Sequence, residues 1–126
     1  MKEHGSYELE IQSKTLVFRA YSSWNYETTI SWGKEAKDLA KLLKHEPWIC
    51  LIDLTNWELI TPDVREYISE INLWANENNL KYLAVVYGFE IQKKLLQKSF
   101  RVLTNVDCEY FKDLDDANKW LNSVEI

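Results

Sequence analysis

Two short apolar runs, WICLIDL at 48–54 and YLAVVY at 82–87, constrain the fold of this chain more than any other feature. Neither run alternates strictly between apolar and polar residues. Such near-continuous apolar stretches are expected of strands that are covered on both faces, as in a parallel sheet flanked by helices. The two runs therefore predict the centre of an α/β domain.

The remaining elements follow from shorter patterns. Strands are expected at 7–12 and 15–21, joined by a two-residue turn at Ser13 and Lys14, with a short last strand at 109–111. Apolar residues at helical spacing predict helices at about 27–44, from Thr61 onward, at 91–103 and at 114–121. The order ββαβαβαβα predicts an α/β fold with a mixed, mostly parallel sheet of about five strands and helices packed on it.

Length and composition limit the classes of function. The 126 residues fit one domain, 1–126, and a net charge of -5 disfavours nucleic acid as a partner. We interpret Cys50 and Cys108 as reduced thiols and not as a disulfide. Because thiols stay reduced in the cytosol, this predicts a cytoplasmic protein. The first residues, MKEHGSYELE, hold no apolar signal region, and no run approaches the roughly 18 apolar residues of a membrane span. Neither secretion nor membrane insertion is expected.

Two motifs carry a resemblance to a known family. Asp53-Leu54-Thr55 follows the central strand, and the chain closes with EYFKDLDDANKWL, which combines a strand, an acidic turn and an Ala-x-x-Trp-Leu helix. In this order the motifs resemble the STAS superfamily, and more closely its SpoIIAA-like (STAS/SEC14-type) branch of small bacterial proteins. The resemblance covers nearly the whole chain. It implies a SpoIIAA-like fold and adds lipid-like molecules to the candidate ligands.

The resemblance also draws attention to Thr61. Anti-sigma-factor antagonists of this superfamily carry a phosphorylatable Ser in an Asp-Ser-Ser-Gly-like element at the start of the second helix. Here that position reads Thr61-Pro62-Asp63-Val64, without Ser or Gly. A helix N-terminus favours the negative charge of a phosphate on Thr61. The simpler interpretation is that Thr61 is the N-cap and that its hydroxyl accepts a backbone N–H.

No catalytic pattern stands out in the sequence. His4 and His45 do not have metal-ligand spacing, and the three glycines are not clustered as in a phosphate-binding loop. Asp53, Glu58 and Asp63 lie near a strand end and a helix start, where carboxylates more often cap than act as acid or base. We therefore expect no catalytic residues, no metal, no cofactor and no enzymatic activity.

A binding site is expected where the parallel strands end, because ligands of open α/β sheets bind outside the carboxyl ends of the strands. Three segments leave those ends: SSWNYE, TNWELIT and YGFEIQ. Their aromatic, amide and hydroxyl groups suit a largely apolar molecule with a polar head. The candidate ligand-binding residues are Trp24, Asn25, Tyr26, Thr55, Asn56, Trp57, Tyr87 and Phe89. The alternative is that the aromatic residues only close the core at the sheet edge.

Two functions follow. The first is a non-enzymatic binding or regulatory module that holds a small apolar or amphipathic, lipid-like ligand at these loops. The alternative is a phosphorylation-switched module of the anti-sigma-factor antagonist type that binds a protein partner. A homodimer through the edge strand of the hairpin or an apolar helix face stays open.

Overall fold

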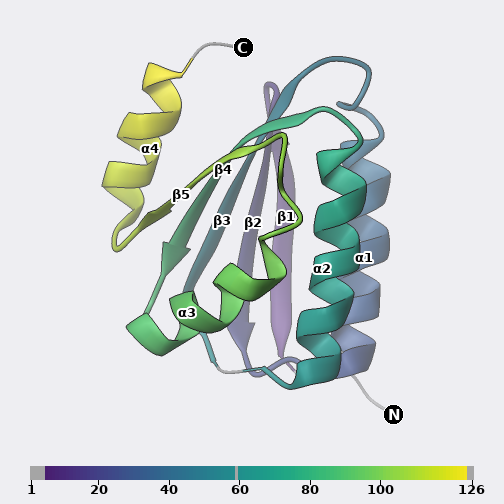
Figure 1. Cartoon of the computed structure of the whole chain (residues 1–126), viewed down its shortest axis with the longest axis vertical. Coiled ribbons are helices and arrows are strands. Elements are labelled where there is room, and N and C mark those ends of the chain that lie inside the picture. Colours follow the sequence, from purple (N-terminus) through teal and green to yellow (C-terminus); the bar gives the residue numbers. More distant parts are fainter. Residues whose placement is uncertain (1–4, 59, 125–126) are drawn as a thin grey trace.

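The computed structural model describes residues 5–58 and 60–124, which form a five-stranded sheet with helices on both faces (Figure 1). The elements in chain order are β1 (Ser6–Gln12), β2 (Thr15–Ser22), α1 (Tyr26–Ala40), β3 (Trp48–Trp57), α2 (Pro62–Asn76), β4 (Leu80–Tyr87), α3 (Glu90–Ser99), β5 (Asp107–Phe111) and α4 (Leu114–Ser123). The predicted ββαβαβαβα order is confirmed. Within the described residues, no helix is long and apolar enough to cross a membrane.

The strands lie in the sheet in the order in which they occur along the chain, β1-β2-β3-β4-β5. β1 and β2 are antiparallel, and Gln12 pairs with Thr15 across the predicted two-residue turn. Every later pair is parallel. β2, β3 and β4 therefore end on one side of the sheet, where α1, α2 and α3 begin, at the lower end of Figure 1. We call this side the carboxyl edge.

The core has two layers, because alternate residues of each inner strand point to opposite faces. On one face, Ile52 and Val85 belong to the larger cluster, which includes residues of α1, α2 and α3. On the other face, Leu51 and Ala84 pack with Ala117 of α4. The two-sided burial predicted for 48–54 and 82–87 is thus present in both strands.

Three expected boundaries differ from the structure by three residues or more. β3 continues to Trp57, because Tyr21 and Ser22 of β2 pair with Asn56 and Trp57 beyond a register shift. α1 ends at Ala40 instead of 44, and α3 ends at Ser99 instead of 103. Beyond both helices the backbone turns more tightly, with i to i−3 hydrogen bonds such as Leu43 N–H to the Ala40 carbonyl and Leu103 N–H to the Phe100 carbonyl.

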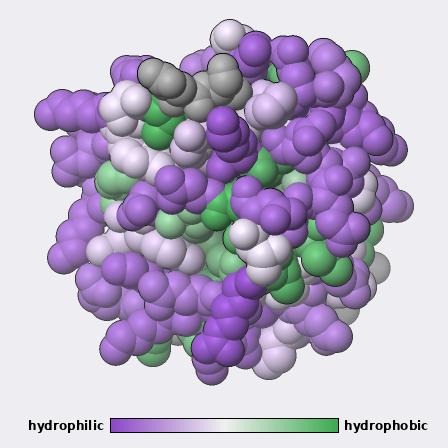
Figure 2. All heavy atoms as spheres, turned by 45° about the horizontal axis from the view of Figure 1, so that its top comes forward, coloured by the Kyte–Doolittle hydropathy of each residue, from purple (hydrophilic) through white to green (hydrophobic). Residues whose placement is uncertain are grey.

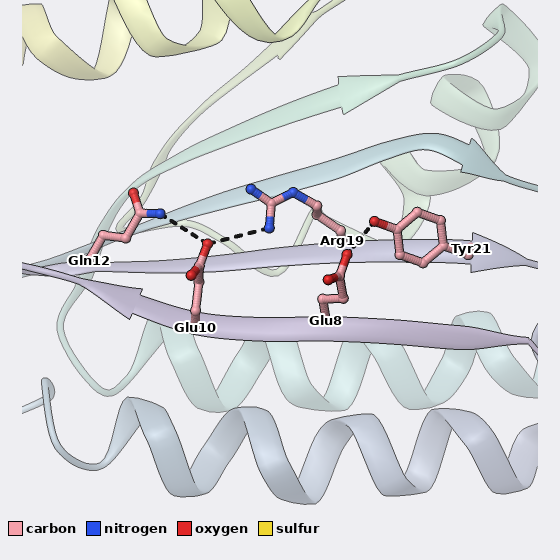
Figure 3. A network of polar contacts seen from close by, with 5 residues as sticks. All are labelled: Glu8, Glu10, Gln12, Arg19 and Tyr21. Carbon is pink, nitrogen blue, oxygen red and sulfur yellow. Dashed lines mark hydrogen bonds and ion pairs between the residues drawn. The ribbon is translucent and has the colours of Figure 1, made fainter.

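A polar network covers β1 and β2 on the face opposite α1 and α2 (Figure 3). Glu10 Oε1 accepts hydrogen bonds from Gln12 Nε2 at 3.0 Å and Arg19 Nη1 at 3.4 Å, and the Tyr21 hydroxyl donates to Glu8. Two β1 strands paired edge to edge in antiparallel fashion would bring the carboxylates of Glu8 and Glu10 from both copies together. These charges therefore disfavour a homodimer through β1.

A substitution of Leu51 tests whether β3 is buried on both faces. The Leu51→Ala change should lower the free energy of unfolding by about 2–5 kcal/mol, because it removes buried methyl groups and leaves a cavity under α4. The matched control is Leu42→Ala, since Leu42 is 64% exposed and Leu51 only 6%; the control should stay within about 0.5 kcal/mol. Urea unfolding measures both, and equal effects would contradict the inner position of β3.

Candidate functional site

One buried side chain, Gln92 of α3, joins the ends of two strands at the carboxyl edge. Its Nε2 donates to the carbonyl oxygens of Leu54 at 3.3 Å and Trp57 at 2.7 Å. Its Oε1 accepts a hydrogen bond from the Gly88 N–H at 3.0 Å. The chain after β4 is thereby held against the end of β3.

Gly88 permits this close approach. A Cβ atom at residue 88 would lie 2.6 Å from the carbonyl oxygen of Thr55, closer than non-bonded atoms come. Thr55 itself makes a local turn, in which its N–H and its hydroxyl both bond to Asp53 Oδ1, at 3.0 and 2.6 Å. Thr55 and the adjacent Asn56 are exposed. Contrary to expectation, both lie in β3 rather than in a loop.

Two of the predicted aromatic residues lie in the core. Trp24 and Trp57 are 3% and 2% exposed, and their ring centroids are 5.1 Å apart. They cluster with Phe18 and Trp32, and Trp24 Nε1 donates to the Ser6 carbonyl at 3.0 Å. The indole N–H groups of Trp32 and Trp57 are buried without a partner in the described part of the chain, so apolar burial and ring contacts stabilise the cluster.

The other residues that were predicted to bind a ligand lie apart from one another along the carboxyl edge. Asn25 is the N-cap of α1, and its Oδ1 accepts from the Thr28 N–H at 3.0 Å. Tyr87 is buried, with its hydroxyl 3.3 Å from Glu90 Oε1. Tyr26 and Phe89 are exposed at the starts of α1 and α3. The structure brings Trp24 and Trp57 together in the core and leaves Tyr26 and Phe89 at the surface.

A surface hollow of about 320 Å³ lies where α1 and α2 begin. It is lined by Tyr26 of α1 and by Asp63, Glu66, Tyr67 and Glu70 of α2, and we call it the acidic groove. Only Tyr26 belongs to the residues predicted to bind a ligand. The signal in the sequence is the i, i+3, i+4, i+7 spacing of the four α2 residues, which places them on one helix face.

A glycine in α1 makes room for one wall of the acidic groove. A Cβ atom at residue 33 would lie 2.5 Å from the ring of Tyr67. Because Gly33 has none, the Tyr67 ring can lie against α1. Tyr26 meets it edge to face, with centroids 6.1 Å apart and ring planes at 77°. Burial, and then the nearby Tyr26 and Glu70, raise the pKa of Tyr67, so its hydroxyl stays protonated near neutral pH.

A second hollow, of about 310 Å³, lies at the other end of the strands. It is lined by Pro47, Asn76, Glu77, Asn79, Leu80, Lys81 and Asn105. Two of its amides serve the fold: Asn76 Oδ1 accepts from the Asn105 N–H at 2.7 Å, and Asn79 Nδ2 donates to the Lys44 carbonyl. Figure 2 turns this end of the molecule forward and shows a mostly hydrophilic surface with scattered apolar residues.

Thr61 occupies the predicted N-cap position of α2 but does not cap it with its side chain. The exposed hydroxyl donates instead to Asp63 Oδ1, which also accepts from the Val64 N–H at 3.0 Å. The expectation that the Thr61 hydroxyl accepts a backbone N–H is therefore wrong: the hydroxyl is engaged as a donor to Asp63, and the Asp63 carboxylate accepts the Val64 N–H. The hydrogen bond from Thr61, followed by that from the backbone, holds the pKa of Asp63 below its usual value.

Comparison with solved structures shows which fold this is. An uncharacterised protein of the DUF3478 family from Shewanella loihica PV-4, described as SpoIIAA-like in fold, superposes with a TM-score of 0.71 at 18% identity over 96% of both chains. An anti-sigma factor antagonist from Mycobacterium paratuberculosis has a TM-score of 0.64 at 11% identity, over 95% of this chain and 96% of that one. The chain has a SpoIIAA-like fold.

The SpoIIAA-like fold predicted from the motifs at 53–55 and 117–121 is confirmed. At these identities the likeness shows the fold alone. No protein-family model matches the chain, and no curated protein matches it.

Neither a group of metal ligands nor a reactive thiol is found among the described residues. No group of three His, Cys, Asp or Glu side chains there is placed to hold a metal ion. Cys50 and Cys108 are both free, and burial raises the pKa of each thiol to about 12. Both therefore remain protonated near neutral pH and are poor nucleophiles.

A substitution of Gln92 tests whether its hydrogen bonds hold the ends of β3 and β4 together at the carboxyl edge. The Gln92→Leu change keeps the size of the side chain but leaves two carbonyl groups and one N–H without their partner, and each such buried group costs about 1–3 kcal/mol. We expect the free energy of unfolding to fall by more than about 2 kcal/mol. Gln97→Leu, at an exposed position of the same helix, is the control and should change little. Similar urea midpoints for both variants would contradict the role of Gln92.

The Thr61–Asp63 contact predicts a pH effect. Thr61→Val should raise the pKa of Asp63 toward its usual value, because the hydroxyl that stabilises the carboxylate is lost. Since this pKa is lower in the folded than in the unfolded state, ionised Asp63 stabilises the fold above about pH 3.9. That contribution disappears as the pH falls through the folded-state pKa. NMR titration of Asp63 measures the shift, and an unchanged pKa in Thr61→Val would contradict the contact.

Proposed function

We propose that this chain is a non-enzymatic binding and regulatory module that recognises a protein partner at its carboxyl edge. The observation that carries the proposal is the acidic groove, an open surface hollow of about 320 Å³ whose two tyrosine rings and three carboxylates can receive a side chain of a partner. An anti-sigma factor antagonist of the same fold supports a regulatory role at the level of fold.

The cavities favour a protein partner over the lipid-like ligand that the sequence suggested. The apolar cavity between α1, α2 and the sheet measures about 40 Å³, and the one lined by Trp24 and Trp57 about 20 Å³. A single water already needs about 10–15 Å³, so neither has room for an acyl chain. Trp24 and Trp57, two of the aromatic residues predicted to enclose such a ligand, pack against each other instead. A partner would therefore bind the surface and not enter the core.

Phosphorylation of Thr61 is not part of the proposal. Thr61 is exposed and lies beside the acidic groove, so a kinase could reach it. A phosphate there would stand next to the Asp63 carboxylate, and like charges at that distance repel. Binding at the groove does not require such a switch.

Crosslinking in cells tests the proposal. A photo-reactive amino acid at Tyr26, Thr55 or Phe89, all exposed at the carboxyl edge, should form covalent adducts with a protein. The matched control positions are Leu42 and Glu77, exposed near the C-terminal ends of α1 and α2. Adducts at the edge and not at the far end are expected, as seen by gel shift and mass spectrometry. Adducts only at the far end, or lipid adducts at the edge, would contradict the proposal.

A further inference from the structure

We infer that the acidic groove binds an arginine side chain presented by a basic segment of the protein partner. The inference rests on the proposed function and names the chemistry of the partner. It follows from the combination of two tyrosine rings with carboxylates that form no ion pair within the described part of the chain.

The tyrosines provide a surface for a planar cation. Tyr26 is 44% exposed, and Tyr67 is held in place by its contact with Gly33. A guanidinium group stacks on such rings and is attracted by their negative faces. Since the two rings meet nearly at right angles, one can stack on the guanidinium while the other borders it.

The carboxylates of the groove have no basic partner among residues 5–58 and 60–124. The ion pairs between described residues join Lys14 to Glu46, Arg19 to Glu10, Lys41 to Asp38 and Lys112 to Glu90, and none includes Asp63, Glu66 or Glu70. A helix N-terminus accounts for acidic residues only in its first turn, where Asp63 lies. Glu66 and Glu70 lie beyond it, so the dipole of α2 does not explain them. Two carboxylates that pair with no described cation and lie beside aromatic rings match the forked donors of arginine.

Other occupants fit the groove less well. A metal ion lacks a suitable group of ligands among the described residues. An anion would be repelled by the carboxylates, and the overall charge of -5 adds to that repulsion. A lysine ammonium would pair with the carboxylates but lacks the planar face that stacks on tyrosine. Arginine uses both features of the groove.

The experiment measures binding of a short capped peptide with two arginines, alongside versions with lysine or with citrulline, the uncharged analogue of arginine. We expect NMR shift changes at Tyr26 and along residues 63–70, in the order arginine, lysine, citrulline. The double change Glu66→Gln and Glu70→Gln should weaken the arginine peptide about tenfold. Tyr67→Leu, which keeps an apolar contact with Gly33, should weaken it about threefold.

The matched control removes two carboxylates elsewhere. Asp115→Asn with Asp116→Asn deletes the same charge from the first turn of α4, and the affinity should stay within about twofold. An equal loss in this control, or equal binding of the arginine and lysine peptides, would overturn the inference. If crosslinking at Tyr26 captures a partner whose binding tolerates Glu66→Gln with Glu70→Gln, the inference fails and the proposed function stands. If no protein crosslinks at the edge, the proposed function itself fails.

Discussion

The burial of β3 and β4 on both faces is the constraint on which the rest of the structure depends. Ile52 and Val85 need the layer of α1, α2 and α3, and Leu51 needs α4 on the other side. Strands covered in this way occupy inner positions of a sheet, and helical crossovers make their neighbours parallel. Parallel strands end on one side, so three helices begin at the carboxyl edge.

Close packing at this edge decides where a site can form. Gln92 ties the ends of β3 and β4 together, and the glycine at position 88 lets the two backbones approach. Trp24 and Trp57 then fill the space beneath the loops, in contact with each other. Little volume remains between sheet and helices, so the surface hollow lies outside the core, between the starts of α1 and α2.

The acidic groove combines residues that stabilise the packing of α1 and α2 with two carboxylates, Glu66 and Glu70, that form no ion pair among the described residues. Gly33 in the middle of α1 costs roughly 1 kcal/mol relative to alanine, and it admits the Tyr67 ring between the helices. Asp63 stabilises the start of α2 through its hydrogen bonds and its charge. Glu66 and Glu70 lie beyond the first turn of α2, and no hydrogen bond or ion pair is found for their carboxylates among the described residues. These carboxylates are the ones that we propose for binding a partner.

The sequence by itself determined the order of elements, the hairpin turn at Ser13 and Lys14 and the helix start at Thr61, because these depend on neighbours only a few residues away. It also indicated the SpoIIAA-like fold. Tertiary structure decided the roles of the aromatic residues at the edge, since Trp57 became a core residue only when its backbone paired with β2. The same holds for the groove. Tyr26 and Glu70 lie far apart along the chain and share one surface because α1 and α2 pack side by side on the sheet.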